Sequence, residues 1–153
     1  MELQTIQKKI YEIRGKQVML DFDLALLYGV ETKVLKQGVK RNIRRFPVDF
    51  MFELTQEEFN SLRSQFVTSN KRGGIRYMPF AFTEQGVAML SSILKSETAI
   101  EINISIIRAF VAVRQYLSVA NHNNKEIEEL KKNVENIKKY QIIVGGLGML
   151  VLP

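Results

Sequence analysis

The 153-residue chain contains no cysteine, which excludes a disulfide framework and thiolate chemistry. Its single histidine, His122, lies in the polar stretch NHNN beside no other obvious metal ligand. We interpret it as an exposed linker residue rather than a catalytic base or a metal ligand. The phosphate-binding pattern GxxxxGK[ST] and the nucleophile pattern GxSxG are also missing. We therefore expect no catalysis, metal or cofactor; a nuclease that uses carboxylates and magnesium is the weakest alternative that residue types leave open.

The N-terminal sequence MELQTIQKKIYEIRG lacks the apolar core of a signal peptide, and we expect a cytoplasmic protein. The hydrophobic fraction of 46% and the charged fraction of 25% are those of an ordinary globular protein. The length suits one domain plus an appendage. A net charge of +6 favours an acidic partner, with nucleic acid ahead of an anionic membrane surface.

Residues 21–46 predict two helices joined by a tight turn. Asp21 is a suitable N-cap for the first helix, and Gly29 is placed where that helix must stop and reverse. Ala25 provides the small side chain needed where two such helices touch, and apolar residues follow one and six positions after the glycine. This spacing is typical of a DNA-binding helix-turn-helix, although the spacing alone has many false positives.

The second helix, predicted over Thr32–Phe46, combines a buried face with a cationic face. It contains six basic residues and no acidic one, so the cationic face repels itself unless a polyanion screens it. The alternative is an αα-hairpin with an ordinary solvated Lys/Arg surface. The predicted buried residues are Leu35, Val39, Ile43 and Phe46. The candidates to read base edges are Thr32, Lys33, Lys36 and Gln37, and those to hold phosphates are Lys40, Arg41, Arg44 and Arg45.

Around this pair of helices the pattern predicts short strands and capped helices. Apolar alternation around Arg14 and Gly15 predicts a β-hairpin within residues 1–20, and residues 49–54 and 77–82 predict two strands that pair. Pro79 favours an edge position or a bulge for the second of these. Thr55 and Thr83 are placed to cap helices over residues 56–66 and 84–94. The segment 67–76 is either a surface loop or a basic arm that reaches DNA through Lys71, Arg72 and Arg76.

The C-terminal third predicts a long apolar helix over residues 96–119, which we interpret as a buried core scaffold. Its polar interruptions argue against a membrane span. After a break at NHNN, residues 120–141 predict a second helix whose heptad positions favour either a homodimeric coiled coil or packing onto the same chain. We assign no role to the apolar, Gly-rich residues 142–153. The heptad positions are Ile127, Leu130, Val134 and Ile137.

Several ordered motifs resemble one family: IRGKQVMLD, DLALLYGV, VKRNIRRFPVDFMFELT, LRSQ and RYMPFAFTEQGVAMLSSIL. Together they are similar to the phage and prophage "ORF-six N-terminal" domain, which is allied with the KilA-N and Bro-N domains. The resemblance spans Ile10 to Leu117. It implies a compact DNA-binding domain of phage regulators and antirepressor-like proteins, usually bacterial, and it assigns no base-contacting residues. Gly38, inside the basic helix, departs from the longer polar residue expected of the family.

The combined prediction is an α+β domain over residues 1–119, with a helix-turn-helix core, a small sheet and a long buried helix, followed by the helix over 120–141. The predicted function is a non-enzymatic regulator of phage or mobile-element origin that binds a specific double-stranded DNA sequence. The competing prediction is an antirepressor-type protein that binds another regulator.

Overall fold

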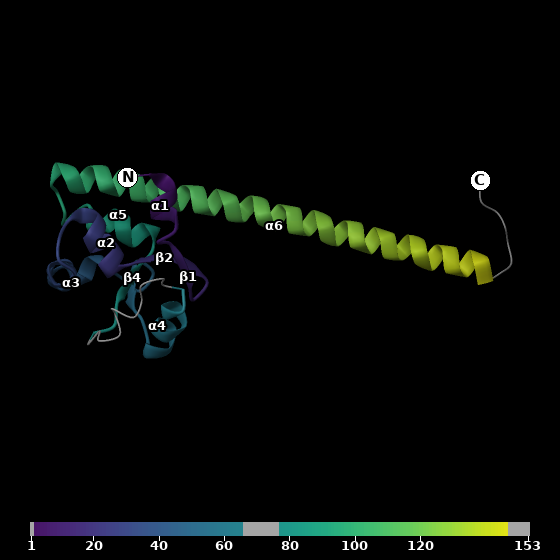
Figure 1. The fold of residues 1–153 in the computed structure, drawn as a ribbon, viewed down its shortest axis with the longest axis horizontal. Coiled ribbons are helices and arrows are strands. Elements are labelled where there is room, and N and C mark those ends of the chain that lie inside the picture. The colour runs from purple at the N-terminus through teal and green to yellow at the C-terminus, as the bar shows by residue number, and fades with distance from the viewer. Residues whose placement is uncertain (1, 66–76, 147–153) are drawn as a thin grey trace. The chain divides into compact units, whose positions relative to one another are not determined.

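The computed structural model describes residues 2–65 and 77–146, with side chains as far as residue 142 (Figure 1). Phe66 and the predicted loop over 67–76 lie outside the described residues. The chain divides into two compact units, Met1–Val113 and Arg114–Pro153. The first unit combines several helices with a four-stranded antiparallel sheet, and this confirms the predicted α+β class.

The sheet has the strand order β1-β2-β4-β3. The predicted hairpin is confirmed, because Arg14 (φ 56°) and Gly15 (φ 71°) form the turn between the first two strands. The predicted pairing of β3 with β4 is also confirmed. The edge position expected from Pro79 is wrong, since β4 lies between β2 and β3; Pro79 precedes the strand and its carbonyl accepts from the Leu54 amide. The strands are β1 Tyr11–Ile13, β2 Lys16–Leu20, β3 Met51–Glu53 and β4 Phe80–Phe82.

Each face of the sheet carries its own core, because successive side chains along a strand point to opposite faces. On one face, Met19 of β2 and Phe82 of β4 are paired neighbours and pack with α2, α3, α5 and α6. On the other face, Leu20 and Ala81 are the paired neighbours and pack with α4. Figure 1 shows α2 and α5 on one side of the strands and α4 on the other. The helices are α2 Asp21–Tyr28, α3 Thr32–Arg41, α4 Gln56–Arg63, α5 Glu84–Leu90 and α6 Glu97–Gly146.

The two predicted threonine caps are confirmed, although both helices end earlier than predicted. Thr55 and Glu58 form a reciprocal capping box at α4. The Thr83 hydroxyl accepts from the Gly86 amide at α5 and donates to the carbonyl of Asp49. A Cβ at position 86 would lie 2.0 Å from the Phe50 carbonyl oxygen, so only glycine fits this contact.

Two features of the helices differ from the prediction. A short helix α1, Leu3–Gln7, precedes the hairpin and buries Ile6 completely. Helix α6 passes through residues 121–124 without the predicted break, because Asn and His lower helix propensity by less than about 1 kcal/mol each and neither proline nor glycine interrupts them.

Helix α6 buries one face in the first unit, through Ala99, Asn103, Ile106 and Phe110. The predicted buried core scaffold therefore holds for this face and not for the whole helix, because Ile100 and Ile104 are 48% and 46% exposed. By length and composition alone, Glu97–Ile142 could also cross a bilayer, a test that core helices of water-soluble proteins pass as well. The absence of a membrane span therefore stays a prediction.

The hairpin turn is joined to α4 by a charged pair that should make the fold sensitive to acid. The Arg14 Nε donates to Glu58 Oε2 over 2.8 Å, and this contact is the main reason that the pKa of Glu58 is lowered to about 2. Because this pKa is lower in the native state, the Glu58 carboxylate stabilises the fold at pH values above its unfolded-state pKa of 4.5. The stabilisation is lost as the pH falls toward 2. We expect Glu58→Gln to flatten this part of the stability profile, measured by urea unfolding at pH 5 and pH 3. Glu57→Gln is the matched control, and an equal flattening there would contradict the assignment.

Candidate nucleic-acid interface

Helices α2 and α3 form the predicted pair with a tight turn. Gly29 ends α2 in the left-handed conformation (φ 74°, ψ 30°), and the Val30 amide donates to the Ala25 carbonyl over 3.0 Å. Ala25 is 1% exposed at the contact, and Leu35 and Val39 anchor α3 in the core. One side of α3 is therefore fixed against the domain, and its other side is presented to solvent.

Helix α3 is shorter than predicted. It ends at Arg41, because Asn42 leaves the helical conformation (φ −117°, ψ 31°) and its side-chain amide donates to the Gly38 carbonyl. Ile43–Arg45 then form a separate 3₁₀ turn before Pro47. Ile43 is 51% exposed rather than buried as predicted, whereas Phe46 is buried. Arg44 and Arg45 are exposed on this turn and do not continue the surface of α3.

Asp21 does not cap α2, and this prediction is wrong. Leu20 occupies the N-cap position and makes no side-chain cap. The Asp21 carboxylate, 1% exposed, instead accepts from the Phe80 amide over 2.8 Å and faces the Lys36 ammonium at 3.4 Å. Burial raises the pKa of Asp21, and the Phe80 amide and Lys36 partly oppose that rise. The carboxylate thereby connects α2 to β4 and to α3.

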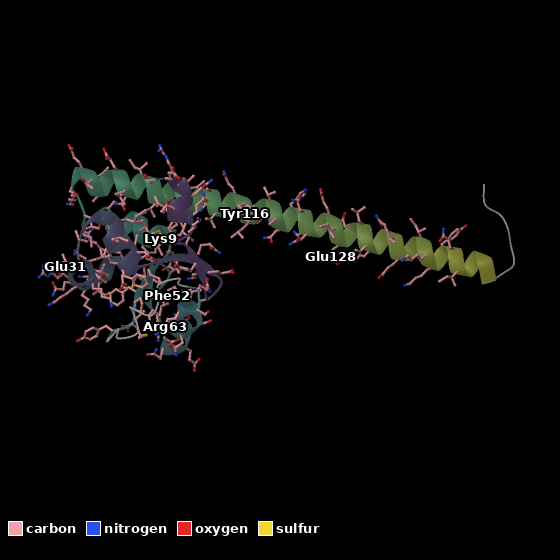
Figure 2. All side chains as sticks on the ribbon, in the orientation of Figure 1. Lys9, Glu31, Phe52, Arg63, Tyr116 and Glu128 are labelled. Carbon is pink, nitrogen blue, oxygen red and sulfur yellow. The ribbon has the colours of Figure 1, made fainter. Side chains whose placement is uncertain are left out.

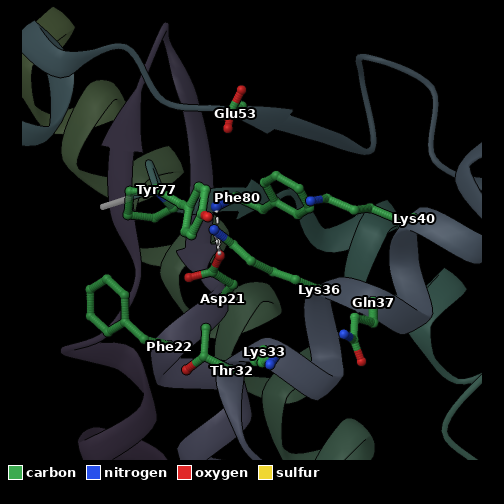
Figure 3. Close-up of a pocket in the computed structure, with 11 residues that line it drawn as sticks. Asp21, Phe22, Thr32, Lys33, Lys36, Gln37, Lys40, Glu53, Tyr77 and Phe80 are labelled. Carbon is green, nitrogen blue, oxygen red and sulfur yellow. Dashed lines mark hydrogen bonds and ion pairs between the residues drawn. The ribbon is translucent and has the colours of Figure 1, made fainter. Parts of the chain in front are cut away.

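Lys36 consequently points inward. Its ammonium donates to the Met78 carbonyl over 2.8 Å and lies 4.8 Å from the centre of the Phe80 ring. Figure 3 shows this side chain reaching from α3 toward Asp21 and Phe80. The helix contains no acidic residue, yet an acid from α2 neutralises one of its lysines. The positive surface of α3 is therefore smaller than the sequence suggests.

The remaining polar residues of α3, except Arg41, line an open groove of about 620 Å³ (Figure 3). Lys33, Gln37 and Lys40 are exposed along it, and Thr32 is half-buried at its end. Positions 33, 37 and 40 are spaced by four and three residues, so they lie in one row on the helix. We name the row Lys33–Gln37–Lys40 the α3 stripe. Such a row offers two mobile cations around one amide, a suitable arrangement for phosphates and base edges.

The opposite wall of the groove was not predicted as part of a site. It is formed by Phe22, Glu53, Tyr77, Pro79 and Phe80. Phe22 comes from α2, which packs directly on α3, whereas the other four come from β3, β4 and the segment before β4 and reach α3 through the sheet. No local pattern in the sequence marks these four residues. Arg41 is exposed on a second hollow beside Gly38 and Ile93. Lys71, Arg72 and Arg76 lie outside the described residues.

A comparison with family models matches residues 8–93 to the ORF6N domain, which is more than half of the chain. The chain belongs to the ORF6N family. ORF6N domains are associated with phages, in agreement with a regulatory role. No curated protein and no solved structure matches the chain. The predicted resemblance is thus confirmed.

The ORF6N match contains the whole sheet, helices α2 to α5 and the complete groove, and it ends before α6. Within residues 2–65 and 77–146, no group of three or more His, Cys, Asp or Glu side chains is arranged to hold a metal ion. The α3 stripe and its groove are the candidate site that lies within the matched residues.

Gly38 of the ORF6N domain has space for a side chain, so its replacement by alanine tests the helical conformation of α3 through the free energy of unfolding. A Cβ there would meet only Ile93 Cδ1, at an ordinary 3.8 Å, so Gly38→Ala should stabilise the fold by about 1 kcal/mol through helix propensity. Gly29→Ala is the contrasting control and should destabilise by about 1 kcal/mol, because its φ of 74° disfavours a side chain. Urea unfolding measures both. Changes in unfolding free energy of the same sign for the two variants would contradict the backbone geometry at Gly29 and Gly38.

Proposed function

We propose that this protein is a non-enzymatic regulator of phage or mobile-element origin that binds a specific double-stranded DNA sequence, with α3 in the major groove. The observation that supports the proposal is the α3 stripe: two exposed lysines flank an exposed glutamine on a helix whose other side is anchored in the core. The net charge of +6 agrees with a polyanionic partner.

Three polar residues of α3 supply the proposed contacts to bases. Thr32 and Lys33 begin the helix, the part that reads bases in helix-turn-helix proteins, and Gln37 lies one turn after Lys33 in the same row. The Gln37 amide can pair with adenine and the Lys33 ammonium can donate to guanine. Gln37→Ala should therefore relax sequence preference more than it weakens total affinity. Lys36, also a candidate from the sequence, has its ammonium engaged by Met78 and Asp21, and we assign it a positioning role.

The proposed phosphate contacts follow at the C-terminal end of α3 and on the turn after it. Lys40 and Arg41 are exposed on the last turn of α3, and Arg44 and Arg45 are exposed on the 3₁₀ turn after it. Phosphate contacts of this kind fix the position of a protein on DNA without reading its sequence. The basic arm predicted from the sequence remains part of the proposal, and it would contact phosphates or a minor groove through Lys71, Arg72 and Arg76.

The direct test is a fluorescence-anisotropy titration of the full chain with a random duplex at two salt concentrations. Micromolar binding that weakens steeply with salt is the expected result. Absence of binding at low salt would overturn the proposal. Selection from a randomised duplex library would then identify the preferred site.

An antirepressor-type protein that binds another regulator is the second candidate. The observation that favours it is an exposed row of apolar side chains on α6, at Ile127, Leu130, Val134 and Ile137. Binding through such a row would depend weakly on salt, whereas DNA binding depends on it strongly. The same titration, run beside a pull-down with a candidate repressor, therefore distinguishes the two functions.

A further inference from the structure

The second unit, Arg114–Pro153, contains an apolar row at heptad spacing. Ile127, Leu130, Val134 and Ile137 follow one another at intervals of three, four and three residues. Each is between 49% and 63% exposed in the single chain. Figure 2 shows side chains projecting on all sides of α6 after Tyr116. A row of this size left in water on an isolated helix needs a partner to be stable.

The same register continues on both sides of the four apolar residues. If Ile127 is an a position and Leu130 a d position, the a and d positions of more than three heptads lie within the described residues, and all of them except Asn123 and Gln141 carry an apolar or aromatic side chain. We name this series the α6 seam: Tyr116, Ala120, Asn123, Ile127, Leu130, Val134, Ile137 and Gln141.

The charges beside the seam select both the partner and its direction. Glu126 occupies a g position and Lys131 the e position of the following heptad. In a parallel coiled coil, g of one helix faces that e of its partner, so two identical chains would form two Glu–Lys pairs. In an antiparallel pair, e positions face e positions, and Lys131 and Lys138 would bring lysine toward lysine. The pattern therefore favours a second copy of this chain in the parallel direction.

We propose that residues 116–141 of α6 form a parallel, in-register coiled coil with a second copy of the same chain. The branched residues Ile127 and Val134 at a, with Leu130 at d, favour two strands. In this register the two polar seam residues, Asn123 and Gln141, each lie beside the same residue of the second chain. A shifted register would bury them against apolar side chains. This inference concerns α6 alone and is independent of DNA binding.

The contacts that these charges make within one helix are easily exchanged. The Glu126 Oε1 atom lies 3.0 Å from His122 Nε2, and the Lys131 Nζ atom lies 3.9 Å from Glu128 Oε1. The side chains of both pairs are largely exposed. Exposed pairs of this kind contribute between zero and about 1 kcal/mol. Glu126 and Lys131 can therefore turn toward a partner helix at little cost.

The absence of cysteine makes a direct test possible, because each introduced thiol is unique in the chain. Under mild oxidation of the full chain, Asn123→Cys and Ile137→Cys should each give a disulfide-linked dimer, since a parallel register places each residue beside its own copy. Lys132→Cys, at the outward f position, is the matched control and should remain largely unlinked. An antiparallel pair would place at most one of the two positions beside its own copy, so cross-linking at only one seam position, or at neither, would overturn the proposal. Circular dichroism verifies that each variant is folded.

A charge exchange tests the partner without a covalent bond. Glu126→Lys and Lys131→Glu should each weaken the dimer about tenfold in sedimentation equilibrium, because two attractive pairs become repulsive. The double exchange should return the dissociation constant to within about threefold of the wild type. Failure of the double exchange to restore association would contradict the parallel arrangement. A monomer, a trimer or helix recruitment to lipid vesicles in place of a dimer would also overturn it.

Discussion

Replacing Lys33 and Lys40 together with alanine should weaken binding to random duplex DNA roughly sixty-fold at 0.1 M salt. Both ammonium groups are exposed on the α3 stripe, whereas the Lys36 ammonium points inward and donates to Met78. Each phosphate contact that releases a counterion multiplies affinity by roughly eight at this salt concentration. Two lost contacts therefore account for the whole expected change.

The salt dependence provides a second, independent measurement. The slope of log affinity against log salt should decrease in magnitude by about 1.8 in the double variant, which is two contacts at about 0.9 each. A loss of affinity with an unchanged slope would show that the lysines act through the fold. Circular dichroism should be unaffected, because both side chains lie outside the core.

Lys132→Ala with Lys139→Ala is the matched control. It removes the same charge from the second unit, and positions 132 and 139 are both f positions that point away from the α6 seam. The control should retain affinity within about threefold, the part of the change due to net charge alone. An equal loss in the control and in the double variant would contradict the assignment of the α3 stripe.

Features set by neighbours in the chain could be predicted from the sequence. The Arg14–Gly15 turn, the Thr55 capping box and the left-handed Gly29 each depend on side chains within four residues, and the structure has all three. Their physical cause is local: a backbone conformation that glycine tolerates, or an oxygen within reach of a free amide. The ORF6N family was equally accessible because its motifs extend over most of the domain.

Features set by distant partners could not be predicted. Asp21 matches the N-cap pattern, but its carboxylate binds the amide of Phe80, 59 residues later in the chain. The same partnership draws Lys36 inward and removes it from the predicted cationic surface. Tyr77 and Glu53 join the groove only through the sheet. A helical-wheel argument identifies which side of α3 is polar, and it cannot tell which polar group is already occupied.

The buried contact between Asp21 and Lys36 leads to the largest expected change in stability. Asp21→Ala should destabilise the domain by about 3 kcal/mol, because it leaves the Phe80 amide without its acceptor and removes the carboxylate that faces the Lys36 ammonium. Lys36→Met removes the cation and leaves a buried carboxylate. The pair Asp21→Asn with Lys36→Met keeps an acceptor for Phe80 and should cost less than the sum of Asp21→Asn alone and Lys36→Met alone, by about 1–3 kcal/mol.

The pH dependence identifies the charge responsible. Burial raises the pKa of Asp21 and Lys36 opposes that rise, so Lys36→Met should raise it further. A carboxyl group whose pKa is higher in the native state than in the unfolded state contributes its full stabilisation at pH values below the unfolded-state pKa of 3.8. That contribution is lost as the pH rises through the native-state pKa. The destabilisation caused by Lys36→Met should therefore be larger at pH 7 than at pH 4.5, measured by urea unfolding. An effect independent of pH would show that the Asp21 charge is not the cause.

The same double variant determines whether Lys36 acts on DNA or on the position of α3. Asp21→Asn with Lys36→Met leaves the α3 stripe intact, so affinity for random duplex should stay within about threefold of the wild type. A phosphate contact by Lys36 would instead cost roughly eightfold at 0.1 M salt and reduce the salt slope by about 0.9. Because Lys36 already donates to Met78 and faces Asp21, we expect the smaller change. The larger one would restore Lys36 to the residues that contact DNA.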